Sequence, residues 1–225
     1  LGWSSPIIAD GKVFLTTATS QTPMKQPEKG TDFSNEYRAQ LVEDGKSAQE
    51  AWDIGAVRDM EYPHEIAVDY LLLAYDLETG KELWRRVFFH GPPPGGRNRK
   101  NSYASETPVT DGEGIFIHIG NLGVWAYSLE GELRWQVRLN AHPMFGGFGT
   151  GGSPALTDDE VIVLNDNEKN QFIAGFAKDD GRELWRTPRV GLGDNHQSGW
   201  SSPLVWENEL RTELVTIGPT TAISY

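Results

Sequence analysis

One phrase of sequence occurs three times in this 225-residue chain, and its spacing limits what the chain can fold into. The copies read AYDLETGKELW (Ala74–Trp84), AYSLEGELRW (Ala126–Trp135) and GFAKDDGRELW (Gly175–Trp185). The tryptophans that end the copies are about 50 residues apart. A repeat of about 40 to 50 residues, with short apolar runs and glycine-containing turns, is typical of the blades of a β-propeller.

A second phrase has the same period and marks the start of each blade. It places a proline directly after a serine or threonine, at Pro6, Pro108, Pro154 and Pro203. The runs KVFLTT, GIFIHI and VIVLN follow turns that contain aspartate, and their β-branched and aromatic residues favour strands. The sequence therefore predicts an all-β fold, a propeller of four-stranded antiparallel blades, with four blades started and three completed.

The two phrases also set the expected blade boundaries. We expect one partial propeller over residues 1–225, with blades at about 1–90, 103–140, 150–190 and 199–225, the last of them incomplete. Blade 1 is about 50 residues too long, which predicts an insertion at about 20–65. The chain opens with Leu1 instead of Met, so an earlier native start is expected.

The second half of this insertion has the apolar spacing of helices. The residues with that spacing are Tyr37, Leu41, Ala48, Ala51 and Trp52. Ser47 and Glu50 have the spacing of a capping box, so two short helices are expected. Such an insertion is either a lid or partner-docking arm on a rigid scaffold, or a surface excursion without function.

The repeated tryptophan is interpreted as a structural residue. Propeller blades are twisted sheets packed face to face, and a large flat side chain would fill each interface and bury about 150–250 Å². A glycine in the neighbouring turn would permit a positive φ and a close approach of the ring. The expected docking tryptophans are Trp84, Trp135 and Trp185, and the expected turn glycines are Gly80, Gly131 and Gly181.

Charge and composition exclude several functions. The formal net charge of −12 disfavours nucleic acid and anionic lipid as partners. No apolar run reaches the roughly 18 residues that a membrane span needs. The chain has no cysteine, and its five histidines show no short metal-binding spacing. Leu164–Asn170 (LNDNEKN) lacks the calcium-loop pattern and is interpreted as a solvated turn. We predict no catalytic residue and no metal site.

The residues before the four prolines are expected to converge at the mouth of the central channel. Their hydroxyls would satisfy backbone groups at the strand starts. Alternatively, Trp3, Trp200 and Glu106 would form a ligand cup at this mouth. His118, within the run IFIHIG, is expected on an inner strand.

Three loops precede first strands and should lie on the same face: His90–Tyr103, Asn140–Gly151 and Gly191–Trp200. Their cations and imidazoles, in an otherwise acidic protein, would suit an anionic or polar ligand. The candidate ligand-binding residues at the mouth are Trp3, Arg97, Lys100, Asn101, Glu106, His142, Asn195, His196 and Trp200.

Ser4–Val13 and Ala74–Trp84 closely resemble the repeat of the pyrroloquinoline-quinone (PQQ)-type β-propeller superfamily. This superfamily contains quinoprotein dehydrogenases, the propeller lipoprotein of the outer-membrane barrel-assembly machinery and other exported bacterial propellers. The resemblance covers everything outside the insertion. It implies seven or eight blades, of which the remaining ones would be absent from this chain, and a periplasmic or extracellular location.

Two main function classes follow. The favoured one is a non-catalytic scaffold without a cofactor, which binds a protein or polysaccharide partner through the loops at its channel mouth. The alternative is a quinoprotein alcohol or sugar dehydrogenase with PQQ and Ca²⁺ on the channel axis, completed by further blades. Few mouth residues offer the oxygens that Ca²⁺ requires, namely Glu106, Asp194 and Asn195. Another propeller enzyme, such as a lyase or hydrolase, is a third possibility.

Overall fold

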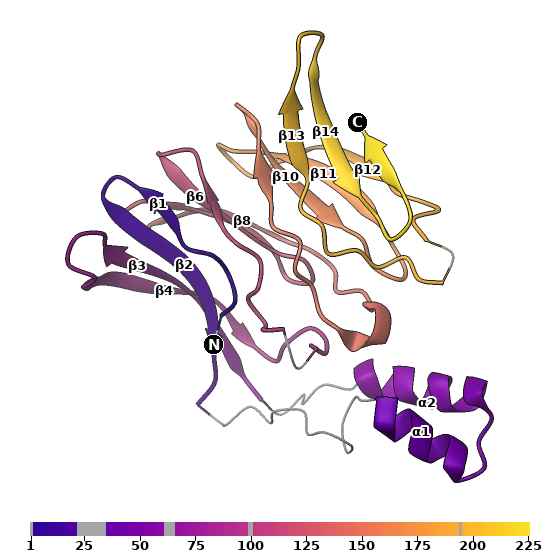
Figure 1. Ribbon diagram of the computed structural model, residues 1–225. Coiled ribbons are helices and arrows are strands. Elements are labelled where there is room, and N and C mark those ends of the chain that lie inside the picture. The colour runs from indigo at the N-terminus through magenta and orange to yellow at the C-terminus, as the bar shows by residue number, and fades with distance from the viewer. Residues whose placement is uncertain (1, 22–34, 61–65, 99–100, 194) are drawn as a thin grey trace.

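The computed structural model describes residues 2–21, 35–60, 66–98, 101–193 and 195–225. In these residues the chain forms four antiparallel sheets that follow one another in chain order, from the indigo N-terminal sheet to the yellow C-terminal sheet (Figure 1). The fold is an all-β partial propeller, as the repeat predicts. Innermost strands of successive sheets lie beside one another, which places the sheets around a shared axis.

Each sheet is a meander in which strands pair in sequence order. The first contains β1 (Ile7–Ala9), β2 (Lys12–Thr19), β3 (Val68–Asp76) and β4 (Glu82–Gly91). The second contains β5 (Val109–Thr110), β6 (Gly114–Ile119), β7 (Gly123–Ser128) and β8 (Leu133–Arg138). The third contains β9 (Ala155–Leu156), β10 (Glu160–Asn165), β11 (Phe172–Ala177) and β12 (Glu183–Pro188). The fourth contains three strands, β13 (Leu204–Glu207), β14 (Thr212–Ile217) and β15 (Ala222–Ser224).

Turn chemistry explains why these strands begin and end where they do. Asp10 and Gly11 both have positive φ, 45° and 67°, which matches the twist of a two-residue hairpin between β1 and β2. Between β3 and β4, the Asp76 carboxylate accepts hydrogen bonds from the backbone N–H and the hydroxyl of Thr79, at 2.7 and 2.5 Å. These bonds lower the pKa of Asp76 and fix the acidic turn of the repeated phrase.

The core lies between the sheets. Phe14, Leu72 and Trp125 are buried where the first sheet meets the second. Phe116 and Val163 are buried where the second meets the third. Because the second sheet has neighbours on both faces, every residue of β6 and β7 is buried. This two-sided burial explains why these runs lack the alternation of a half-exposed strand.

Two of the repeated tryptophans lie at equivalent seams. A Cβ added to Gly131 would lie 3.0 Å from the Trp84 indole, and one added to Gly181 would lie 2.5 Å from that of Trp135. Both glycines have a positive φ, 81° and 73°. The Trp135 Nε1 donates a hydrogen bond of 2.6 Å to the Lys178 carbonyl in the same turn of the third sheet. Each indole therefore rests on a glycine turn of the following sheet.

The third tryptophan makes a different contact. The Trp185 Nε1 donates to a carboxylate oxygen of Glu160 in its own sheet, at 3.0 Å. A Cβ on Gly175 would lie 2.4 Å from that indole nitrogen, which explains why glycine replaces the alanine of the other copies. At Gly80, the equivalent turn of the first sheet, an added Cβ would meet nothing within 4 Å.

Two helices, α1 (Asn35–Glu43) and α2 (Ala48–Met60), lie between β2 and β3. The predicted capping box is confirmed: Ser47 Oγ accepts from the Glu50 N–H, and a Glu50 carboxylate oxygen accepts from the Ser47 N–H at 2.8 Å. The rest of the predicted insertion, 22–34 and 61–65, lies outside the described residues. Within the described chain, neither helix has the length and apolar character for crossing a bilayer.

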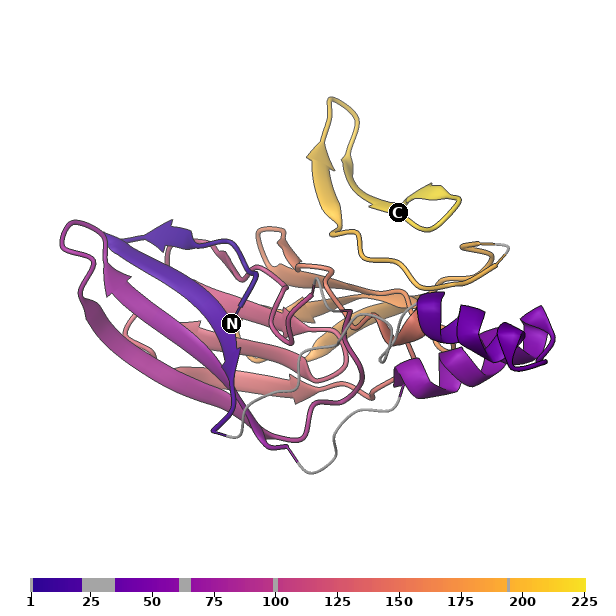
Figure 2. The ribbon, with the colours of Figure 1, turned by 60° about the horizontal axis from the view of Figure 1, so that its bottom comes forward.

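Helix α2 packs on the short 3₁₀ turn η1 (Phe145–Gly147), which belongs to the loop before the third sheet. Figure 2 shows both helices on this side of the molecule, away from the first sheet. The insertion therefore leaves the first sheet and ends beside a loop that leads into the third.

Candidate functional site

The residues that precede the four blade prolines are joined by a relay of hydrogen bonds. The Ser5 N–H donates to the Thr107 hydroxyl, the Thr107 N–H to the Ser153 hydroxyl, and the Ser153 N–H to the Ser202 hydroxyl, at 2.9, 2.9 and 3.0 Å. Each hydroxyl thus satisfies a backbone donor of the preceding sheet, which agrees with the backbone-satisfying reading of these residues. The relay therefore links the starts of the innermost strands of all four sheets.

Glu106, the residue directly before Thr107, differs from the residues at the equivalent position in other sheets. The equivalent Ser4 and Ser201 hydroxyls donate to backbone carbonyls of their own sheets, at 2.8 and 2.5 Å. The Glu106 side chain is 1% exposed and accepts a hydrogen bond from the Gly120 N–H at 3.3 Å. Burial raises the pKa of this carboxyl, and a hydrogen bond from the Thr150 side chain opposes the rise. Glu106 therefore lies beneath the mouth, and its carboxyl is not open to a ligand.

The structure brings the three mouth loops together. The Asn101 carboxamide donates to the carbonyls of Phe148 and Thr150, at 3.0 and 3.1 Å. These bonds join the first of the three loops (90–103) to the second (140–151). The buried Ser198 hydroxyl accepts from the Phe145 N–H at 2.9 Å, which joins the second loop to the third.

A carboxylate then fixes the third loop. One Glu168 oxygen accepts hydrogen bonds from the Gln197 N–H, the Ser198 N–H and the Ser198 hydroxyl, at 3.1, 2.8 and 2.6 Å. Glu168 lies between β10 and β11, so the third sheet anchors the loop that leads into the fourth. The three loops form one cross-bonded face, which we call the mouth face.

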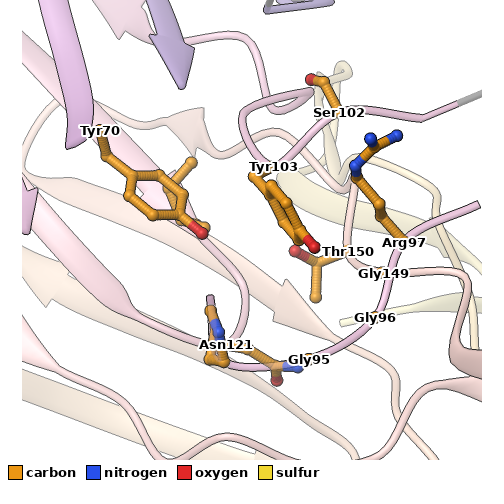
Figure 3. A pocket seen from close by; sticks show the side chains of 11 residues that line it. Tyr70, Gly95, Gly96, Arg97, Ser102, Tyr103, Asn121, Gly149 and Thr150 are labelled. Atoms are coloured by element: carbon orange, nitrogen blue, oxygen red, sulfur yellow. The ribbon is translucent and has the colours of Figure 1, made fainter. Parts of the chain in front are cut away.

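A small cavity opens in the mouth face between the first and second loops (Figure 3). Tyr70 of β3 and Tyr103 contribute aromatic rings, and the Arg97 guanidinium lies 5.3 Å from the Tyr103 ring centroid. Burial raises the pKa of Tyr103, and the Arg97 cation opposes that rise. The cavity volume is about 20 Å³, room for roughly one water molecule. It is a socket for a small polar group and too small for a cofactor.

The remaining candidate residues differ in their exposure. His142 is half-buried, and burial together with Lys169 lowers the pKa of its imidazole. Asn195 is exposed, whereas His196 stacks on Phe145 with 4.5 Å between ring centroids.

Two exposed tryptophans lie at the equivalent position of the first and fourth sheets. The Trp200 Nε1 donates to the Gly149 carbonyl at 2.8 Å, so its ring lies over the second loop. Trp3 is 64% exposed and donates its backbone N–H to Ala104. Lys100, a candidate from the sequence, lies outside the described residues, as does Asp194.

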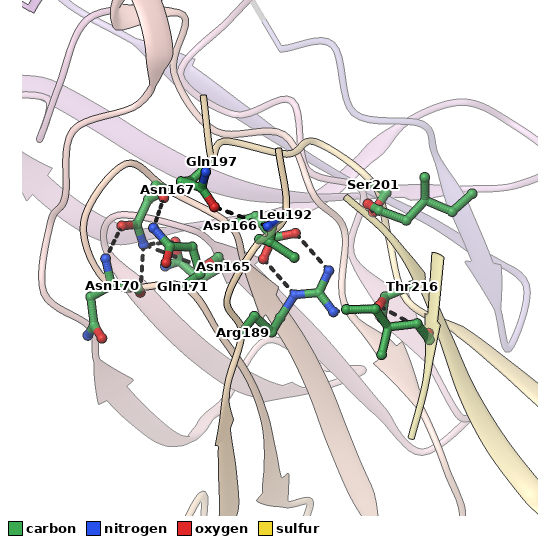
Figure 4. A network of polar contacts seen from close by, with 12 residues as sticks. Asn165, Asp166, Asn167, Asn170, Gln171, Arg189, Leu192, Gln197, Ser201 and Thr216 are labelled. Carbon is green, nitrogen blue, oxygen red and sulfur yellow. Dashed lines mark hydrogen bonds and ion pairs between the residues drawn. The ribbon is translucent and has the colours of Figure 1, made fainter. Parts of the chain in front are cut away.

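The interpretation of Leu164–Asn170 as a solvated turn holds for Lys169 and Asn170, which are exposed, and is wrong for the residues before them. Asn165, Asp166 and Asn167 are at most 3% exposed and belong to a buried polar network (Figure 4). The Asn167 carboxamide oxygen accepts from two backbone N–H groups of its own turn, and its amide donates to Asn165. The three side chains end a buried strand that the fourth sheet covers, which is why they are not solvated.

An ion pair that sequence reasoning missed lies at the end of the third sheet, and its arginine also bonds to the fourth sheet. Arg189 and Asp166 are fully buried and form a bidentate pair at 2.7 and 3.0 Å. The same guanidinium donates to Thr216 Oγ1 and Tyr225 Oη, at 2.6 and 2.7 Å. Burial raises the pKa of Asp166, and Arg189 opposes that rise. No local motif signals this pair, because its members come from separate loops.

The mouth residues that the structure describes do not fit a PQQ–Ca²⁺ centre. Among the described residues, no group of three or more His, Asp or Glu side chains is arranged to hold a metal ion. Ca²⁺ needs about six to eight oxygen ligands. The one carboxylate predicted at the mouth and described, Glu106, is already bonded to backbone and to Thr150.

Comparison with known proteins gives one family match. The profile of the PQQ_2 family, described as "Outer membrane protein assembly factor BamB", matches residues 67–210. No curated protein matches the sequence.

Solved structures resemble the chain at low sequence identity. BamB from Moraxella catarrhalis is 14% identical, with a TM-score of 0.44 over 71% of this chain and 45% of its own. The quinohemoprotein alcohol dehydrogenase ADHIIG from Pseudomonas putida HK5 is 14% identical, with a TM-score of 0.46 over 68% of this chain and 27% of its own. A europium-containing methanol dehydrogenase is 15% identical, with a TM-score of 0.41 over 58% and 25%. This chain spans less than half the length of each of these proteins.

Proposed function

The chain belongs to the PQQ_2 family of outer membrane protein assembly factor BamB, and on that premise we propose that it is a non-catalytic module that binds a protein partner through its mouth face. The family description, which names an assembly factor, supports a protein as the partner. A periplasmic or extracellular location belongs to the same proposal, supported by the outer-membrane wording of that description.

The cross-bonding of the three loops is the observation that carries the proposal. Asn101 and Ser198 tie the loops to one another, and Glu168 ties the third loop to the third sheet. A surface that is already ordered loses less conformational entropy when it binds a partner. Loops on a rigid scaffold are also where proteins most often place their binding residues.

Two ionisable side chains near the mouth are closed to a substrate, which favours binding over acid–base chemistry at these two positions. A general acid or base must reach the reacting group within hydrogen-bond distance. Glu106 and His118 are each 1% exposed, and each is bonded to backbone. Burial lowers the pKa of His118 to about 4, so this imidazole is neutral near pH 7. Neither side chain is available to a substrate at the mouth.

We further propose that additional blades cover the two outermost sheet faces. Ile8 and Val87 of the first sheet are 59% and 51% exposed, and Leu204 of the fourth is 60% exposed. Apolar side chains in such numbers are typical of faces that pack against another sheet. The open turn at Gly80 would then receive a tryptophan from a preceding blade.

Photocrosslinking in cells that produce the full protein tests the proposal. A photoreactive amino acid is placed at Asn195 or at Arg97 on the mouth face, and at Glu78, an exposed turn residue between β3 and β4, as the control. We expect one protein adduct shared by the two mouth positions and absent from Glu78. Adducts that form equally well at Glu78, or no adduct at either mouth position, would refute the proposed binding face.

The quinoprotein alternative is tested separately. Purified protein is mixed with PQQ and Ca²⁺ and followed by absorbance and thermal unfolding. We expect neither a spectral change nor a rise in Tm, since a ligand that binds the folded state must stabilise it. Saturable stabilisation by both components together would support the dehydrogenase instead.

A further inference from the structure

Five aromatic rings form one connected cluster that runs from the insertion to the mouth face. Trp52 of α2 lies 5.8 Å from Phe145, and Phe145 stacks on His196 at 4.5 Å. His196 and Phe148 each lie 6.3 Å from Trp200, measured between ring centroids. Three segments far apart in the sequence thus build one surface, which we call the aromatic shelf.

The two tryptophans at the ends of the shelf are held in place and remain partly open. The Trp200 indole is anchored by its hydrogen bond to Gly149 and is 37% exposed. The Arg38 guanidinium lies 4.7 Å from the Trp52 ring centroid, and Trp52 is 44% exposed. The Trp200 N–H is therefore already used, and its ring offers a ligand mainly apolar surface.

Polar side chains flank the shelf at both ends. Gln49, three residues before Trp52 on α2, is exposed and lies on the same side of that helix. Asn195 is exposed beside His196. A carboxamide both donates and accepts hydrogen bonds, as the hydroxyl groups of a sugar do.

We propose that the aromatic shelf binds a neutral glycan chain, with sugar rings packed against the exposed parts of Trp52 and Trp200 and hydroxyls bonded to Gln49 and Asn195. The C–H groups on one face of a sugar ring carry partial positive charge and are attracted to the negative face of an aromatic ring. This site overlaps the mouth face at Phe145, Phe148 and residues 195–200, but glycan binding there does not depend on the protein-binding proposal.

The shape and charge of the surface favour a glycan over an apolar peptide. Protein interfaces are anchored by side chains that fill deep pockets. The cavity of the mouth face is only about 20 Å³ and is lined by none of the shelf residues, whereas exposed ring surface accommodates a flat ligand. The net charge of −12, with Glu50 and Asp53 exposed next to Trp52, repels acidic glycans. An uncharged chain meets no such repulsion.

The test titrates the purified chain with cellohexaose, chitohexaose and maltohexaose, followed by calorimetry and by tryptophan fluorescence. Decaproline and an oligogalacturonate serve as the peptide and acidic-glycan probes. We expect at least one neutral hexasaccharide to bind with a dissociation constant on the order of 0.1–1 mM. Trp52→Ala and Trp200→Ala should each weaken that binding about tenfold or more, which corresponds to the loss of one stacked ring.

Trp206→Ala is the matched control, because Trp206 is 51% exposed but lies on β13, outside the shelf. Trp200→Phe retains a ring and should bind more tightly than Trp200→Ala, which separates stacking from a folding defect. The proposal is overturned if no neutral hexasaccharide binds, if binding survives in the Trp52→Ala/Trp200→Ala double variant, or if only decaproline or the acidic probe binds. Loss of glycan binding with intact protein crosslinks at Asn195 and Arg97 would leave the protein-binding proposal standing.

Discussion

At the scale of single residues, the contact between an indole and a glycine joins neighbouring sheets. At Gly181 the φ is 73° and the Trp135 ring lies where a Cβ would be, at 2.5 Å. At Gly80 the φ is similar, 67°, but the surrounding space is open. A substitution at Gly80 therefore measures the cost of backbone strain alone, whereas one at Gly181 measures that strain together with the clash with Trp135.

We predict that Gly181→Ala destabilises the protein more than Gly80→Ala. Alanine at a positive φ costs about 1–2 kcal/mol at either position. At Gly181 the clash with Trp135 should add about 1–3 kcal/mol. Urea unfolding of both variants measures the difference, and equal losses would show that the indole does not depend on the glycine.

His118 gives a prediction about pH. Its Nδ1 donates to the Gly152 carbonyl across the seam between the second and third sheets, at 3.1 Å, and burial lowers the pKa of the imidazole to about 4. Below its usual pKa of about 6.5, the unfolded chain therefore binds a proton that the folded chain does not. The stability from neutral His118 is complete above pH 6.5 and is lost as the pH falls toward 4.

Replacing His118 with glutamine, which is not ionisable, should remove this dependence. Between pH 6.5 and 4, the free energy of unfolding of the wild-type protein should fall by on the order of 3 kcal/mol more than that of His118→Gln. Glu106 acts in the opposite direction, because burial raises its pKa, and it is present in both proteins. Unfolding free energies measured across this pH range provide the check. Parallel curves for the two proteins would contradict the assignment.

The residue scale also shows where sequence reasoning reached its limit. The serine or threonine before each proline indicated a backbone-satisfying role, and the relay from Ser5 to Ser202 shows that role. Glu106 was a candidate ligand group because it lies in the run before Pro108, at the expected channel mouth. Its burial depends on Gly120 and Thr150, which no local pattern connects to it.

At the scale of elements, the polar network between the third and fourth sheets is the least expected feature. Sequence patterns predicted the strands and the two insertion helices, since these depend on local spacing and turn residues. They did not predict that Arg189 would reach Asp166, because that pair forms only when two loops from the ends of β10 and β12 meet. The contact of Trp52 with Phe145 was not predicted either, because these two residues are far apart in the sequence.

We predict that Arg189→Met releases the fourth sheet from the third. The substitution leaves the Asp166 carboxylate buried without its partner, which costs about 3–5 kcal/mol. Hydrogen exchange should become much faster in β13, β14 and β15, while β6 and β7 keep their protection.

The double variant Arg189→Met/Asp166→Leu is the control for this prediction. It removes both charges and should recover much of the lost stability, since apolar replacements of a buried pair are often tolerated. If exchange in the fourth sheet is unchanged in Arg189→Met, the bonds from Arg189 to Thr216 and Tyr225 do not hold that sheet.

At the scale of the whole molecule, the repeat period decided the architecture. A marker every 50 residues required a repeated four-stranded unit, and the sheets follow one another as that unit demands. The period also predicted that the three loops before first strands would share one face. The bonds from Asn101 and Ser198 show that these loops meet.

Our central claim is that this cross-bonded mouth face is the surface that contacts a protein partner. Hydrogen–deuterium exchange of the protein, alone and with the partner captured by crosslinking at Asn195, tests it most directly. We predict slower exchange in residues 140–151 and 191–200 of the complex and no change in the outer turn at 77–81. Protection of that outer turn, with the mouth loops unchanged, would contradict the claim.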